Sequence, residues 1–224
     1  MSITVKYKQY QFAKYIFGNN EYEYNTFNEI PNYNNIIYLN CSYSELTKLP
    51  KLPNSLQILD CSHNELTELP ELPNSLIELR CEWNHLLTSL PEFPNSLMKL
   101  HCQWNLQLSS LPDLPNSLIE LDCEWNNLTE LPKLPNSLQK LNCKHNLLIE
   151  LPKLSNSLIE INCKNNQLDV LPNLPNSLKY LNCKNNQLTS IPELPNSLQK
   201  LKIEKYDFLE INKNHYKYLT NIYS

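Results

Sequence analysis

This chain of 224 residues is mildly acidic, with a net charge of −4 at pH 7, which argues against nucleic acid as its main partner. Its single glycine, Gly18, excludes the glycine-rich phosphate loops, dinucleotide-binding turns and nucleophile elbows of common enzyme classes. No apolar stretch has the length of a membrane span or a signal peptide, so the sequence predicts a cytoplasmic protein that is not an enzyme and needs no cofactor or metal.

The amino-terminal segment, residues 1–29, is rich in aromatic residues and lacks the repeat that follows it. Ile3, Val5 and Tyr7 alternate as in a strand, and the next residues show no clean period. A stack of repeats exposes its core at both ends unless other residues cover it. We therefore predict that residues 1–29 form an amino-terminal cap.

A repeat of about 20 residues begins near residue 30 and continues to residue 203. Its most regular mark is a column of cysteines at intervals of 20 or 21 residues: Cys41, Cys61, Cys81, Cys102, Cys123, Cys143, Cys163 and Cys183. Around Cys61, residues 58–62 alternate between outward and inward positions, with Leu59 and Cys61 inward. A fixed period of this length is typical of a solenoid, and we predict about nine short strands stacked as a parallel sheet.

The other half of each coil carries two prolines. The recurring motif is Leu49-Pro50-Lys51-Leu52-Pro53-Asn54-Ser55, and all 16 prolines belong to this rhythm, which only Ser155 interrupts. Proline fixes φ and lacks an N–H, so two prolines per coil forbid a helix and favour an extended, polyproline-like path. The convex side of the solenoid is therefore predicted to be helix-free.

The full repeat resembles the short leucine-rich repeats of bacterial secreted effectors of the YopM and IpaH type, with the pattern L-P-x-L-P-x-S-L-x-x-L-x-C-x-x-N-x-L-T. This resemblance covers residues 30–203 and implies a right-handed leucine-rich repeat solenoid with a parallel sheet on its concave face. Three features depart from the family: cysteine at the third core position, one extra residue in each of the coils at Cys81 and Cys102, and no catalytic domain after the repeats. With a carboxy-terminal cap over residues 204–224, we expect one cooperative domain.

Two columns of the repeat are predicted to be structural. The asparagine three residues after each cysteine can turn inward and bond to the backbone of the bend and of the neighbouring coil: Asn64, Asn84, Asn105, Asn126, Asn146, Asn166 and Asn186, with Ser44 in the first coil. The cysteines are expected about 4.8 Å apart with parallel Cβ vectors. That geometry fits neither disulfides nor a metal site, so we predict reduced, buried thiols and a cytosolic type of compartment.

The concave face of a solenoid carries whatever specificity the protein has. Two residues after the cysteine, this face presents the only three tryptophans, Trp83, Trp104 and Trp125, with His63 and His145 on either side. Stacked at the strand spacing, these rings would form an aromatic strip at the edge of the sheet, and exposed aromatic clusters are common binding hot spots. The alternative is that the indoles only pack over the one-residue insertions nearby.

Charged positions beside the strip complete the predicted partner-binding surface: Arg80 and His101 just before the cysteine, and Glu82, Glu124, Lys144, Lys164 and Lys184 just after it. The surface is mixed and acidic around the tryptophans and basic around the three lysines. Charges of both signs around an aromatic centre suit a protein or peptide partner. The lysine column is equally consistent with an ordinary solvated face.

These features predict a non-enzymatic scaffold that binds a protein on its concave leucine-rich repeat face, with no membrane association. The resemblance to secreted effectors implies a host signalling protein as the partner and the host-cell cytosol as the compartment. Two alternatives stay open: a substrate-recruiting arm of a ubiquitin-ligase-like assembly, and a self-associating structural protein, although a homo-oligomer is not predicted.

Overall fold

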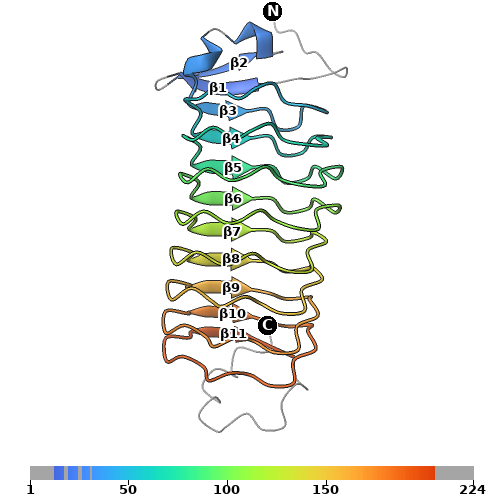
Figure 1. The fold of residues 1–224 in the computed structure, drawn as a ribbon, viewed down its shortest axis with the longest axis vertical. Helices are drawn as coiled ribbons and strands as arrows, with labels where there is room; N and C mark the ends of the chain where they lie inside the picture. Colours follow the sequence, from blue (N-terminus) through green and yellow to red (C-terminus); the bar gives the residue numbers. More distant parts are fainter. Residues whose placement is uncertain (1–12, 18–19, 25–26, 31, 205–224) are drawn as a thin grey trace, which may run out of the picture.

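The computed structural model describes residues 13–17, 20–24, 27–30 and 32–204, so most of the residues assigned to the two caps lie outside the described part. Nine three-residue strands lie side by side in parallel, one per coil (Figure 1): β3 (Tyr38–Asn40), β4 (Ile58–Asp60), β5 (Glu78–Arg80), β6 (Lys99–His101), β7 (Glu120–Asp122), β8 (Lys140–Asn142), β9 (Glu160–Asn162), β10 (Tyr180–Asn182) and β11 (Lys200–Lys202). The predicted solenoid with a parallel sheet along one side is confirmed.

A hairpin extends the sheet before the first coil. Strands β1 (Ala13–Phe17) and β2 (Asn20–Tyr24) pair antiparallel, and β1 also pairs antiparallel with β3. Two 3-10 helices, η1 (Phe27–Glu29) and η2 (Tyr33–Asn35), connect the hairpin to β3. The sheet order is therefore β11 to β3 in sequence, followed by β1 and β2.

The strands are shorter than the five residues predicted for 58–62, because the chain bends soon after the cysteine. Strand β4 ends at Asp60, and the ladder then continues through two single hydrogen bonds. Cys61 N–H donates to the Arg80 carbonyl at 2.8 Å, and His63 N–H donates to the Glu82 carbonyl at 2.9 Å. His63 has a φ of 53°, a left-handed conformation that cannot continue a strand.

The core runs the length of the stack as rows of leucine and cysteine. In each cysteine coil the leucine or isoleucine two residues before the cysteine and the cysteine itself point inward, as predicted, and Leu59 and Cys61 are fully buried. All eight cysteines are free and buried. No residue between 36 and 204 is helical, so the prediction of a helix-free return path is confirmed for these coils. The described residues also contain no helix long and apolar enough to cross a membrane.

The serine of the Pro-Asn-Ser motif ties its coil to the one before it, and where Ser155 replaces the proline, the Ser155 hydroxyl makes that bond instead, to the Asn136 carbonyl at 2.8 Å. Ser75 Oγ donates to the carbonyls of Asn54 at 2.7 Å and of Leu56 at 2.6 Å, both in the preceding coil. The turn itself is closed by a hydrogen bond from Leu76 N–H to the Pro73 carbonyl at 3.0 Å. Because proline removes backbone donors from this side, these hydroxyl groups supply coil-to-coil hydrogen bonds that the backbone lacks.

The asparagine column is structural, as predicted. The Asn146 side-chain nitrogen donates to two cysteine carbonyls, that of Cys123 in the preceding coil at 2.9 Å and that of Cys143 in its own coil at 3.2 Å. Its side-chain oxygen accepts a hydrogen bond from Leu128 N–H at 3.1 Å. Each buried amide thereby satisfies backbone groups on both sides of a bend where no ladder exists.

Both one-residue insertions lie directly after the asparagine, and the asparagine column adapts to them. Asn105 Oδ1 accepts from the Asn84 N–H at 2.8 Å, and Asn126 Oδ1 accepts from the Asn105 N–H at 2.9 Å. Where the preceding coil has no insertion, the asparagine side-chain oxygen instead accepts from the backbone N–H of the leucine that lies two residues after the preceding coil's asparagine. The inserted residues bulge outward and leave Leu86 and Leu106 about half exposed, at 46% and 50%.

Candidate functional site

The predicted aromatic strip is a continuous stack of six rings at one edge of the sheet. Successive ring centroids are 4.0, 5.4, 4.4, 4.4 and 3.7 Å apart and the planes are within 15° of parallel, in the order Tyr43, His63, Trp83, Trp104, Trp125, His145. We call these six residues the aromatic column. Stacked rings attract each other by about 0.5–1.5 kcal/mol per pair beyond their burial.

Side-chain amides extend the aromatic column toward the last coils. The Asn165 side-chain nitrogen lies 2.7 Å from Nε2 and 3.0 Å from Nδ1 of the His145 ring, and the Asn185 amide donates to the Asn165 oxygen. Eight successive coils therefore place a flat side chain at the same position. From His63 to Trp125 each ring lies between two others, which cover its faces and leave its edge toward solvent, whereas Tyr43 at the end of the column is 69% exposed.

Every residue of the aromatic column has a left-handed backbone, with φ between 52° and 61°. This conformation costs a residue other than glycine on the order of 1 kcal/mol. Asn165 and Asn185 adopt the same conformation without a ring, so the bend belongs to the repeat. Where rings are present, their mutual attraction is of the same size as this cost. Ring contact with an insertion occurs once among the described residues, where His85 meets Trp83 edge-on at 5.6 Å. The stack also spans coils without insertions, so covering the insertions does not account for it.

Beside the aromatic column, charged side chains line the outward side of strands β3–β11 and the position after each cysteine, a surface we call the sheet face. Arg80 contacts Glu78, with Nε 2.6 Å from Oε1, and Lys99 lies 3.7 Å from the other oxygen of that glutamate. Lys144 contacts Glu124 at 2.7 Å. All twelve residues predicted to contact a partner thus lie in the aromatic column or on the adjoining sheet face.

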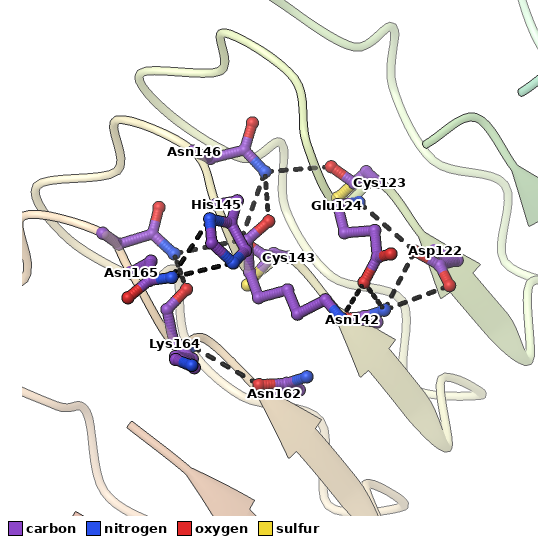
Figure 2. A network of polar contacts seen from close by, with 12 residues as sticks. Asp122, Cys123, Glu124, Asn142, Cys143, His145, Asn146, Asn162, Lys164 and Asn165 are labelled. Atoms are coloured by element: carbon purple, nitrogen blue, oxygen red, sulfur yellow. Dashed lines mark hydrogen bonds and ion pairs between the residues drawn. The ribbon is translucent and has the colours of Figure 1, made fainter. Parts of the chain in front are cut away.

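A polar network joins the acidic and basic parts of the sheet face (Figure 2). The Asn142 side-chain nitrogen donates to both carboxylate oxygens of Asp122 at 3.1 Å and to Glu124 Oε2 at 2.7 Å. Glu124 also holds Lys144, so one carboxylate bridges β7 and β8. Asp122 and Asn142 are not among the residues that the sequence predicts for the site, although the residue before the cysteine is polar in all eight cysteine coils.

Two carboxylates on the sheet face are poorly solvated. Burial raises the pKa of Glu82 to about 7, with Asp60 and Asp122 adding repulsion, and the Glu82 Oε2 atom has no hydrogen-bond partner among the described residues. Burial also raises the pKa of Asp122, to about 6, although its hydrogen bond from Asn142 opposes the shift. The described residues include no group of three or more His, Cys, Asp or Glu side chains placed to hold a metal ion.

The raised pKa of Glu82 makes the stability of the fold depend on pH. The folded protein binds this proton more tightly than the unfolded chain does, so the contribution of Glu82 to stability falls as the pH rises from about 4.5 to about 7. We expect Glu82→Gln to raise the melting temperature relative to wild type at pH 8 and to change it little at pH 4.5. The same substitution at the exposed Glu68 is the control, and a gain for Glu82→Gln that is equal at both pH values would contradict this prediction.

Neither a scan against protein-family models nor a search of curated proteins returned a match. Solved structures do match. YopM from Yersinia enterocolitica WA-314 superposes with a TM-score of 0.70 at 37% identity, covering 74% of this chain and 36% of that protein. The leucine-rich repeat domain of a Shigella effector gives 0.64 at 36% identity, over 70% of this chain and 72% of that domain.

A third similar structure is the functional domain of InlJ from Listeria monocytogenes, which includes a cysteine ladder. It gives a TM-score of 0.55 at 26% identity, covering 80% of this chain and 51% of that domain. The present chain thus spans about a third of the Yersinia protein and most of the Shigella domain. The resemblance inferred from the repeat pattern is confirmed by these matches.

Proposed function

Since this chain belongs to the leucine-rich repeat family, we propose that it is a non-enzymatic scaffold that binds a protein partner along the aromatic column and the adjoining sheet face. The observation that carries this proposal is that the aromatic column and the charged sheet face lie side by side. A row of partly exposed indole edges runs beside charged groups of both signs, on a surface held rigid by the stack.

The geometry of the column favours a protein over a sugar as its ligand. Sugars stack on the open faces of aromatic rings, whereas here neighbouring rings occupy the faces of Trp104 on both sides. Indole edges with flanking carboxylates and lysines offer apolar contact and hydrogen bonding together, which is how tryptophan contributes at protein interfaces.

The kind of protein that binds this surface is also part of the proposal. A host signalling protein, or the substrate of a ligase carried by a separate chain, would each use the same surface, and eight reduced thiols suit a cytosolic type of compartment. Self-association is the alternative without a foreign partner, and it would appear as a concentration-dependent mass at micromolar protein.

To test the proposal, the three tryptophans are replaced by residues that can still stack in the aromatic column. Histidine already occupies the aromatic column at two positions, so the triple variant Trp83→His, Trp104→His, Trp125→His is expected to fold and to lose the indole edges. In affinity capture from a host-cell lysate, proteins bound by wild type should be depleted at least about fivefold on the variant, since a central tryptophan contributes 1 kcal/mol or more. Identical capture by both proteins, with equal thermal stability, would sink this assignment of the site.

A further inference from the structure

Charge is divided between the two ends of the sheet face. The acidic half consists of strands β4–β7 and the residues after their cysteines. With every carboxylate ionised it carries six carboxylates and two cations, a formal net charge of −4: Asp60, Glu78, Glu82, Glu120, Asp122, Glu124, Arg80 and Lys99. The raised pKa values of Glu82 and Asp122 make this charge less negative near pH 7. Strands β8–β11 carry six lysines and two carboxylates, a net charge of +4: Lys140, Lys144, Lys164, Lys184, Lys200, Lys202, Glu160 and Glu204. We call the second set of strands the basic half.

Most cations of the basic half have no partner within the described residues. Lys144 is held by Glu124, and Lys200 lies 5.9 Å from the centre of the Tyr180 ring. Ion pairs involving Lys140, Lys164 or Lys184 are absent from the described part of the chain. The acidic half differs, because both of its cations contact Glu78.

Hydrogen-bond donors lie between the lysines. The Asn162 side-chain oxygen accepts the Lys164 backbone N–H at 3.5 Å, and its nitrogen has no partner among the described residues (Figure 2). A hollow of about 260 Å³ opens beside Asn162, and three carboxylates line it together with Lys140 and Tyr180: Glu120, Asp122 and Glu160. The hollow itself therefore disfavours an anion, whereas the lysines after the cysteines, Lys164 and Lys184, combine unpaired positive charge with a nearby amide donor.

From this arrangement we infer that the basic half binds an acidic segment of the protein partner, in an extended conformation. This inference rests on the proposed function and names the chemistry of the partner. Four strands about 4.8 Å apart span about 14 Å, which an extended chain covers with four or five residues at about 3.3 Å each. Carboxylates of such a segment would complement the lysines and accept hydrogen bonds from the asparagine amide.

The acidic half of the same face disfavours a long polyanion. A nucleic acid that continued past β8 would meet Glu120 and Asp122 on β7 and Glu124 just after it, where like charges repel. A short acidic peptide segment ends before that point. The charge division also orients the partner, because its acidic residues must lie toward the carboxy-terminal coils.

The probe is a fluorescein-labelled hexaglutamate peptide, followed by fluorescence anisotropy with the full chain at low salt. The test variant is Lys164→Glu with Lys184→Glu, and the matched control is Lys133→Glu with Lys153→Glu, which makes the same charge change at exposed positions on the return path. We expect the test variant to weaken binding at least tenfold and the control to change it less than twofold. The neutral pair Lys164→Gln and Lys184→Gln should fall between wild type and the test variant, and it keeps the test valid if the charge reversal impairs folding.

Three results would overturn the inference: no binding of the peptide by wild type, equal weakening in the control variant, or equally tight binding of a single-stranded DNA hexamer with the same lysine dependence. The tryptophan-to-histidine variant separates this inference from the proposed function. It should bind hexaglutamate as wild type does. If the tryptophan-to-histidine variant loses protein capture but wild type does not bind hexaglutamate, the proposed function stands and the acidic-segment inference fails. If the variant keeps its protein capture and wild type does not bind hexaglutamate, both fail.

Discussion

Asn126→Leu is expected to lower the free energy of unfolding by about 3 kcal/mol. The Asn126 amide donates to the carbonyls of Cys102 at 3.0 Å and Cys123 at 2.9 Å, and its oxygen accepts the buried Asn105 N–H at 2.9 Å. Both carbonyls keep a second donor, but the Asn105 N–H loses its acceptor. Two lost hydrogen bonds at about 1 kcal/mol each and one unpaired buried donor at about 1–3 kcal/mol add up to about 3–5 kcal/mol, and the expected loss is the lower end of this range.

The adjacent residue supplies the control. Asn127 is exposed, and its backbone N–H donates to the Leu108 carbonyl at 2.9 Å regardless of the side chain, so Asn127→Leu should change stability by less than about 0.5 kcal/mol. For a chain of this size, the Asn126 variant should melt about 6–12 °C lower than wild type. Equal melting temperatures for the two variants, followed by circular dichroism, would refute the structural role of the asparagine column.

The second large effect we expect is that burial protects the cysteine thiols from chemical reagents. All eight cysteines are buried, and burial raises the pKa of seven of them well above the usual range: Cys41, Cys61, Cys81, Cys102, Cys123, Cys143 and Cys163. Because the thiolate is the reactive form, native protein should react with an aromatic disulfide reagent at pH 8 at least about a thousandfold more slowly than protein in guanidinium, where all eight should react at once.

The Asn126→Leu variant tests whether thiol protection depends on the asparagine column. In Asn126→Leu the carbonyls of Cys102 and Cys123 lose a bond each, so peptide mapping after brief labelling should find these two cysteines modified first. Prompt labelling of several cysteines in native wild type would contradict the buried column. Labelling of the variant that is spread evenly over all eight would instead show that the stack opens as one unit.

The repeat alone allowed the solenoid and its inward columns to be predicted, because a strict period puts the same residue type at the same place in every coil. Leu59, Cys61 and Asn64 each follow directly from that rule, and proline chemistry alone predicted the helix-free return path. The end of the strand at Asp60 was placed two residues too late, since the left-handed bend occurs at a histidine, with no glycine or proline to mark it.

The sequence also determined which residues share the sheet face, since neighbours in the stack lie one period apart. Only the tertiary structure decided what those neighbours do to one another. The parallel stacking of Trp83, Trp104 and Trp125, the capture of the Asn142 amide by Asp122, and the raised pKa of Glu82 depend on side-chain rotamers and on water excluded by adjacent coils. A repeat period determines the register between coils, whereas ring orientation and desolvation arise only when side chains some 20 residues apart pack together.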